Sequence, residues 1–192
     1  MTPDSRSAAT DAARLASGAL PPAEVGTSDE RVWRRPPVRV ATPEDAAVLV
    51  DLRTVMFEAM GTPAPALAEP GWRLAAQRWF ADRAGAPDVR IVVAERDGQV
   101  VSGAVGEVTA LIPGPNTVNG SVGLISNVAT LPPWRGLGLA AACTDDLLRW
   151  FVHHTDVTRV DLFATEAGAR IYTRRGFTRR EFPAMSRVVD RR

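Results

Sequence analysis

The stretch that decides the fold is Ser121-Val-Gly-Leu-Ile-Ser-Asn-Val-Ala-Thr130, continued by Leu131-Pro-Pro-Trp-Arg-Gly-Leu-Gly-Leu-Ala140. Its first half is rich in β-branched and apolar residues, which predicts a strand. From Gly136 to about Val152 the apolar residues recur at helical spacing. One face of this helix carries Leu139, Cys143, Leu147 and Phe151. The sequence therefore predicts a strand, a tight turn and a helix with one buried face, on which Cys143 is a small core residue.

The turn between this strand and this helix has the composition of an anion-binding site. A helix N terminus exposes unpaired backbone N–H groups and the positive end of the helix dipole. Gly136 and Gly138 remove side chains that would keep a phosphate away from those groups. Arg135 adds a planar fork of donors for the same anion. We therefore expect a ligand that carries phosphate groups.

The bulk properties of the chain restrict its class. The 192 residues are 45% hydrophobic and 23% charged, with a formal net charge of +1, which is typical of a globular protein of one domain. This charge gives no electrostatic reason to expect a nucleic acid or a membrane surface as a partner. The single Cys excludes an intramolecular disulfide. We expect a cytoplasmic protein that binds no metal. Whether it forms a homodimer stays open.

The first half of the chain divides into an extension and the start of a domain. Residues 1–35 contain few large apolar side chains, which predicts a mobile extension, and residues 36–192 are expected to form one domain. Val38 to Ala41 is a short predicted strand. Thr42-Pro-Glu-Asp45 is a strong helix start, with Thr42 as N-cap and Asp45 able to reach back. This helix is expected to end at Gly61.

The remaining elements follow from the same kind of pattern. We expect a Pro-broken loop over 62–70 and a helix over 71–83. A hairpin follows, with strands over 89–94 and 100–111 joined by a turn at Asp97-Gly98, and then a loop over 112–120. After the central helix come a strand over 159–164, a short helix capped by Thr165 and ended by Gly176, and one or two strands over 177–189. The order β-α-α-β-β-β-α-β-α-β predicts a mixed α/β fold.

Two segments resemble those of a known family. Arg135, Gly138 and Ala140 match the acyl-CoA signature of the GNAT superfamily of N-acyltransferases, which is Arg or Gln, two residues, Gly, one residue, then Gly or Ala. Pro132 stands three residues before the arginine, as a proline usually does there in the family. The segment 165–177 resembles the family's late helix, with Tyr172 followed by Gly-Phe. The resemblance covers about residues 38–189 and is strongest after Ser121.

The resemblance implies a GNAT-like fold and a particular ligand. In this family a mostly antiparallel sheet, flanked by about four helices, is splayed between its fourth and fifth strands, and acetyl-CoA lies in the gap. The pantetheine arm would bond to the backbone of Val128, Ala129 and Thr130. The pyrophosphate would lie on the N–H groups of Gly136, Leu137, Gly138, Leu139 and Ala140, next to Arg135. Thr165 stands where the family often has Asn; its hydroxyl can still cap a helix.

Acyl transfer to an amine needs a neutral amine, donors for the developing oxyanion and a proton for the leaving thiolate. Tyr172 matches the family's Tyr and is protonated at neutral pH, so it is the candidate acid; the alternative is a Tyr packed on the sheet. The backbone N–H of Val128 is the candidate oxyanion donor.

The general base is left with several candidates. Glu107, on a strand beside the presumed acceptor cleft, can act directly or through water, although an acidic residue on a strand is more often simply solvated. Glu58 is a second candidate, and Ser126 or Asn127 could orient a water. The amine can also lose its proton to solvent.

Other residues receive structural interpretations. The adjacent His153 and His154 suit the C-terminal end of a helix rather than a metal site. Four aromatic residues are expected in the core, with one or two lining the acceptor pocket: Phe57, Trp72, Trp79 and Phe80. Four arginines are expected on a solvated face, with one near a CoA phosphate: Arg174, Arg175, Arg179 and Arg180.

These inferences together predict an N-acetyltransferase that moves the acetyl group of acetyl-CoA directly to a primary amine. The acceptor would be a small molecule or a peptide. An acidic acceptor cleft would favour polyamines or aminoglycosides, and an open, flat cleft would favour peptides. The alternative from another class is an acyl-CoA-binding regulatory module without catalysis.

Overall fold

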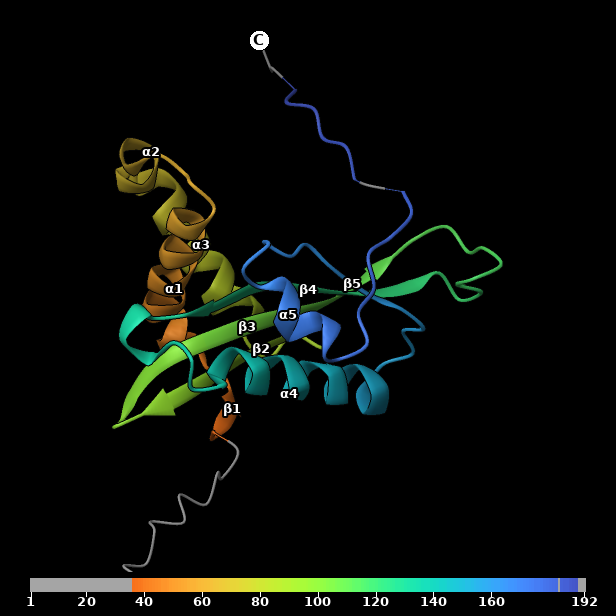
Figure 1. Cartoon of the computed structure of the whole chain (residues 1–192), viewed down its shortest axis with the longest axis horizontal. Coiled ribbons are helices and arrows are strands. Elements are labelled where there is room, and N and C mark those ends of the chain that lie inside the picture. The colour runs from red at the N-terminus through yellow and green to blue at the C-terminus, as the bar shows by residue number, and fades with distance from the viewer. Residues whose placement is uncertain (1–35, 183, 190–192) are drawn as a thin grey trace, which may run out of the picture. The chain divides into compact units, whose positions relative to one another are not determined.

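A five-stranded sheet forms the centre of the fold in the computed structural model, which describes residues 36–182 and 184–189. The predicted extension, residues 1–35, lies outside these described residues. The strands follow one another across the sheet in chain order (Figure 1): β1 (Val38–Val40), β2 (Val89–Arg96), β3 (Gln99–Ala110), β4 (Ser121–Thr130) and β5 (Val160–Leu162). The first four pair antiparallel and β5 is parallel to β4, so the predicted mixed sheet is confirmed.

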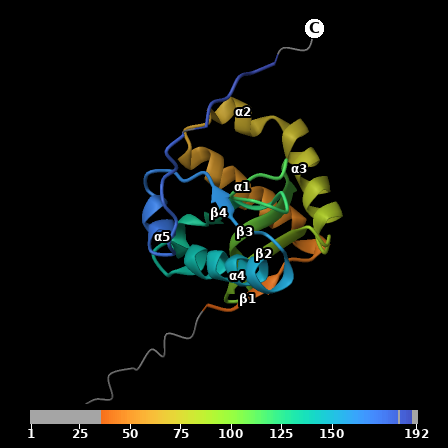
Figure 2. The same ribbon diagram turned by 90° about the vertical axis from the view of Figure 1, so that its right-hand side faces the viewer.

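Helices lie on both sides of this sheet (Figure 2). On one side are α1 (Ala46–Ala59), α2 (Ala64–Ala68) and α3 (Pro70–Arg83), and on the other are α4 (Leu139–His154) and the short α5 (Ala169–Thr173). Helix α2 lies within the segment that we predicted as a loop. Its prolines fall before and within the first turn, where a missing N–H costs no helical hydrogen bond.

Each side of the sheet has its own hydrophobic cluster. The first packs α1 and α3 on the sheet through buried side chains that include Leu49, Leu52, Phe80, Ile91 and Val93. The second packs α4 on the other side, and the predicted face of that helix is at most 1% exposed at Leu139, Cys143, Leu147 and Phe151. The predicted buried face of α4 is therefore confirmed.

The close approach of α4 to the sheet depends on glycine. A Cβ added at Gly123 on β4 would lie 2.7 Å from the ring of Phe151, and one at Gly106 on β3 would lie 3.1 Å from Leu147. Both side chains are fully buried, so a larger residue on either strand would force the helix outward.

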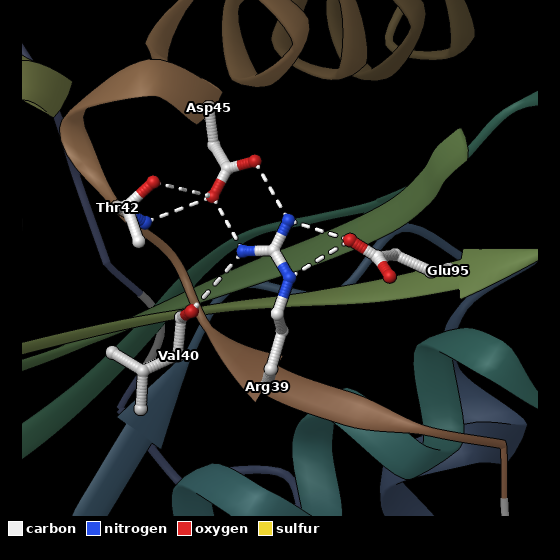
Figure 3. Close-up of polar contacts among 5 residues, drawn as sticks. All are labelled: Arg39, Val40, Thr42, Asp45 and Glu95. Atoms are coloured by element: carbon white, nitrogen blue, oxygen red, sulfur yellow. Dashed lines mark hydrogen bonds and ion pairs between the residues drawn. The ribbon is translucent and has the colours of Figure 1, made fainter. Parts of the chain in front are cut away.

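The start of α1 is held by an ionic network that joins three elements (Figure 3). The carboxylate of Asp45 accepts the Thr42 backbone N–H at 2.8 Å, as predicted for the helix cap, and also accepts two bonds from the Arg39 guanidinium. Arg39, on β1, donates through Nε to Glu95 on β2 at 2.8 Å. The network therefore fixes the entry of α1 relative to the sheet edge.

The C-terminal segment differs from the prediction. Residues 177–182 and 184–189 contain no strand, although one or two were expected. Phe182, Met185 and Val188 are 78%, 97% and 85% exposed, so they contribute nothing to the core. β-propensity stabilises a strand only where a neighbour pairs with it and a face is buried. Within the described chain the sheet ends at β5, which is three residues long.

Candidate active site

A β-bulge interrupts β4 at the centre of the site. Gly103 on β3 pairs with Ala129 and Val105 pairs with Ser126, so Asn127 and Val128 together stand opposite the single residue Ala104. Asn127 has a φ of 52°, in the left-handed region that Asn tolerates better than most residues. A bulge leaves the extra residue unpaired and bends its strand. The backbone of β4 is therefore turned away from regular pairing where the resemblance implies contacts with pantetheine.

The strands β4 and β5 separate just before the bulge. They pair only through Gly123, Leu124 and Ile125. Beyond these pairs, the two segments 126–130 and 163–165 both line one cavity of about 820 Å³. The predicted splay between the fourth and fifth strands is therefore confirmed, and it opens a space of the size that ligand sites in proteins have.

The predicted phosphate turn lines the same cavity. Arg135, Gly136, Gly138, Leu139 and Ala140 contribute to its wall, whereas Leu137 does not and is 42% exposed. Within the described residues, no side chain caps the N terminus of α4, and its first turn has no acidic residue. Backbone N–H groups at this end are thus open to an anion.

Arg135 is held close to the diverging strand. Its Nε donates to the backbone carbonyl of Thr130 at 3.2 Å, and the side chain is otherwise exposed at the cavity wall. The structure thus brings together the predicted residues Val128, Ala129 and Thr130 of β4 with the turn at the start of α4.

Tyr172 lies on α5 and lines this cavity. Its ring meets that of Phe177 edge to face at 6.0 Å. Burial raises the pKa of Tyr172 above its ordinary value near 10, and the charge of Arg175 partly opposes this. Thr165, also in the cavity wall, accepts the Gly168 N–H at 3.2 Å and so orders the turn before α5.

The arginines after Tyr172 are not all solvated, contrary to our expectation. Arg175 is partly buried and pairs with Asp145 on α4, and the exposed Arg180 pairs with Asp161. Arg174, which lines the cavity, and Arg179 are exposed as predicted.

A second cavity, of about 760 Å³, meets the first at the bulge. Ser126 and Asn127 line both. Glu107 lies in the second cavity and not in the first, and Glu58 is exposed and lines neither. All four aromatic residues discussed above line this cavity, and only Phe80 is fully buried: Phe57, Trp72, Trp79 and Phe80. The second cavity is thus the one available to an acceptor.

Arg53 is a member of this site that the sequence did not reveal. It lies on α1, its guanidinium stands 4.7 Å from the centre of the Phe57 ring, and its Nη1 donates to the side-chain oxygen of Asn127. Burial lowers the pKa of Arg53, and the nearby charge of Glu107 opposes this. The available signal was weak: a charged residue within an apolar helix face, four residues before an aromatic ring.

Comparisons with known proteins agree with this geometry. The sequence model of the Acetyltransferase (GNAT) family matches residues 52–177, about two thirds of the chain. The chain belongs to this family and is an acyltransferase. No protein of curated function matches its sequence.

Solved structures share the fold at low sequence identity. A GCN5-related N-acetyltransferase from Ralstonia eutropha has a TM-score of 0.70 at 23% identity, covering 80% of this chain and 97% of its own. A predicted acetyltransferase with acetyl-CoA from Clostridium acetobutylicum has a TM-score of 0.68 at 22% identity, covering 78% and 95%. Glucosamine-6-phosphate N-acetyltransferase from Arabidopsis thaliana has a TM-score of 0.59 at 16% identity, covering 80% and 98%. Across the described residues, no helix has the length and apolar character needed to cross a membrane.

Proposed function

We propose that the protein transfers the acetyl group of acetyl-CoA directly to a primary amine of a small molecule or peptide. The observation that carries this proposal is the single cavity in which the bulged strand, the uncapped start of α4 and Tyr172 meet. Each of the three corresponds to one requirement of the reaction: an aligned thioester, an anchored pyrophosphate and a proton donor.

The chain's own groups fit the donor substrate. The open N–H groups from Gly136 to Ala140 match a pyrophosphate, since two of these residues, Gly136 and Gly138, have φ of 80° and 75° that turn the backbone inward without a side chain. The unpaired edge of β4 after Ile125 matches an extended amide-bearing arm, which binds as an added strand. Acetyl-CoA supplies a thioester with an electrophilic carbonyl carbon and a thiolate leaving group.

Two groups then act at the reacting centre. The Val128 backbone N–H, in the bulge, stabilises negative charge that develops on the carbonyl oxygen. The Tyr172 hydroxyl donates its proton toward the sulfur as the thiolate leaves. Its raised pKa keeps this hydroxyl protonated at neutral pH. Glu107, in the acceptor cavity, takes a proton from the amine directly or through a water oriented by Ser126 or Asn127.

Direct transfer is favoured over a covalent acyl-enzyme. The chain's single cysteine, Cys143, lies on the buried face of α4, and burial raises the pKa of its thiol to about 12. Such a thiol is neither accessible nor ionised at neutral pH, so it does not serve as a nucleophile.

The test measures binding and turnover separately. Acetyl-CoA binding is followed by calorimetry, and thiol release is followed with a mixed panel of primary amines and peptides, the products being identified by mass. We expect acetyl-CoA binding, amine-dependent thiol release and N-acetylated products. Acetyl-CoA binding without thiol release in the presence of any amine or peptide would show an acyl-CoA-binding module instead of an enzyme. Absence of acetyl-CoA binding would overturn both the enzyme and the binding module.

A further inference from the structure

The walls of the acceptor cavity are aromatic rather than acidic. Phe57 and Trp72 meet edge to face at 5.8 Å, and Trp79 and Phe80 do so at 5.4 Å. The indole N–H of Trp72 is already donated to the carbonyl of Ala66 at 3.1 Å. These rings therefore present apolar surface, which suits an apolar group on the ligand.

Arg53 brings a positive charge into this apolar cavity without an ionic partner. The structure records ion pairs for eight arginines, among them Arg39, Arg73 and Arg175, but within the described residues it records none for Arg53. A guanidinium has five N–H donors, and the recorded side-chain bond uses one of them, to Asn127. Burying a charge without a partner is unfavourable, and the Phe57 ring offsets this only in part.

Glu107 supplies the opposite charge in the same cavity. It does not form an ion pair with Arg53, because no carboxylate oxygen of Glu107 lies within the 4 Å that such a pair needs. The two side chains nevertheless interact through their charges. A cation and an anion held apart in one cavity are complementary to a ligand that carries both charges, with its anionic group beside Arg53 and its cationic group beside Glu107.

These charges lie next to the point where chemistry would occur. Asn127, which accepts the Arg53 bond, belongs to the bulge and lines both cavities. A ligand whose carboxylate binds Arg53 would therefore be held close to the Val128 backbone. Its amine would then lie between Glu107 and the thioester.

From these contacts we infer that the acceptor is an amine that also carries a carboxylate and an aromatic or branched apolar group, as an apolar α-amino acid does. The carboxylate pairs with the Arg53 fork, the ammonium group faces Glu107 before it loses its proton, and the apolar group lies against Trp72 and Trp79. This inference rests on the proposed acetyl transfer and narrows its acceptor. A polyamine would place a second cation beside Arg53, which the charges disfavour.

The experiment compares amines that differ only in the carboxylate. L-phenylalanine is paired with 2-phenylethylamine and L-leucine with 3-methylbutylamine, and kcat/KM for acetylation is measured for each. A bidentate, charge-assisted bond that is lost with the carboxylate predicts about a tenfold or larger preference for the amino acid in each pair. Equal rates within the pairs, or faster acetylation of the amines without carboxylate, would overturn the inference.

Substitutions test whether Arg53 causes the preference for amines that carry a carboxylate. Arg53→Gln should abolish the preference by lowering kcat/KM for the amino acids, and Arg53→Lys should retain part of it, because the charge remains and the fork is lost. Arg78→Gln removes an equal charge from an exposed position of α3 and should retain the full preference. A preference that survives in a folded Arg53→Gln protein would also overturn the inference.

A binding measurement separates this inference from the proposed function. L-phenylalanine and 2-phenylethylamine are titrated by calorimetry into the protein saturated with CoA. Carboxylate-dependent binding that Arg53→Gln removes would support the acceptor site even if no acetyl transfer occurred. If neither compound binds, nor L-leucine, while another amine is acetylated, the acceptor assignment fails and the proposed function stands.

Discussion

Arg175 and Asp145 form a two-point ion pair, with Nε 2.6 Å from Oδ1 and Nη2 3.0 Å from Oδ2. The remaining nitrogen, Nη1, donates to the backbone carbonyl of Ile171 at 2.9 Å. Asp145 lies on α4 and Ile171 on α5, so one side chain joins the helix that carries Tyr172 to the helix whose start forms the phosphate turn. The position of Tyr172 relative to the N terminus of α4 therefore depends on this pair.

Removing either partner should loosen α5. Arg175→Ala and Asp145→Ala are each expected to lower the free energy of unfolding by about 1–2 kcal/mol, because the pair is bidentate and partly shielded from water. The double variant should show a coupling energy of about 1 kcal/mol in a double-mutant cycle by denaturant unfolding. The exposed Arg180 is the control, since Arg180→Ala should cost less than about 1 kcal/mol. Additive losses from Arg175 and Asp145 would contradict a direct interaction.

Tyr172→Phe tests the proposed acid. The hydroxyl is needed when the thiolate leaves and not when acetyl-CoA binds, so kcat should fall about a hundredfold with little change in acetyl-CoA affinity. The raised pKa of Tyr172 also predicts the pH profile. An acid works in its protonated form, so its contribution is lost only as the pH rises past about 10. Stopped-flow or steady-state rates that are equal in the two proteins would remove Tyr172 from the mechanism.

The parts of the fold that were predicted correctly depend on local chemistry. Three features follow from residues that are close in sequence: the cap at Thr42 and Asp45, the Asp97-Gly98 turn with φ of 51° and 75°, and the buried face of α4. The family signature similarly located the turn at the start of α4 that lines the larger cavity.

The parts that were missed depend on distant neighbours. Residues 177–189 have strand-like composition, but those that the structure describes pair with no strand, and the edge strand β5 is only three residues long. Arg53 becomes part of the site only because a bulge at Asn127, 74 positions later, approaches α1. Trp72 packs against the edge of the buried cluster and Trp79 is 36% exposed, so both can line a cavity, whereas Phe80 is the fully buried aromatic residue of α3. None of these contacts leaves a periodic trace in the sequence.

Asp45→Asn should change the stability of the protein in a pH-dependent way. The hydrogen-bonded guanidinium of Arg39 holds the pKa of Asp45 below its ordinary value. A carboxylate with a lowered folded pKa stabilises the folded state above its unfolded pKa, about 4, and this contribution is lost as the pH falls through the folded pKa.

The variant should therefore lose about 1–3 kcal/mol of unfolding free energy near neutral pH, and its difference from the wild type should shrink below about pH 4. Urea unfolding at a series of pH values measures both. Asp82→Asn, at an exposed position of α3, is the control, and its unfolding free energy should stay close to that of the wild type at every pH. A difference that is constant with pH would contradict the ionic role of Asp45.

Gly138 has a left-handed backbone at the N terminus of α4, with a φ of 75°, and a Cβ added there would meet no atom within 4 Å. Gly138→Ala therefore introduces backbone strain and no clash, at a cost of about 1–2 kcal/mol. Gly85 has a φ of 86° and equally open space, but it lines neither cavity.

Both alanine variants, Gly138→Ala and Gly85→Ala, should lose similar stability by thermal or urea unfolding. Only Gly138→Ala should weaken acetyl-CoA binding, by about tenfold or more, since strain relief reorients N–H groups that face the pyrophosphate. Calorimetry that finds equal acetyl-CoA affinity in the two variants would exclude the turn as the phosphate anchor.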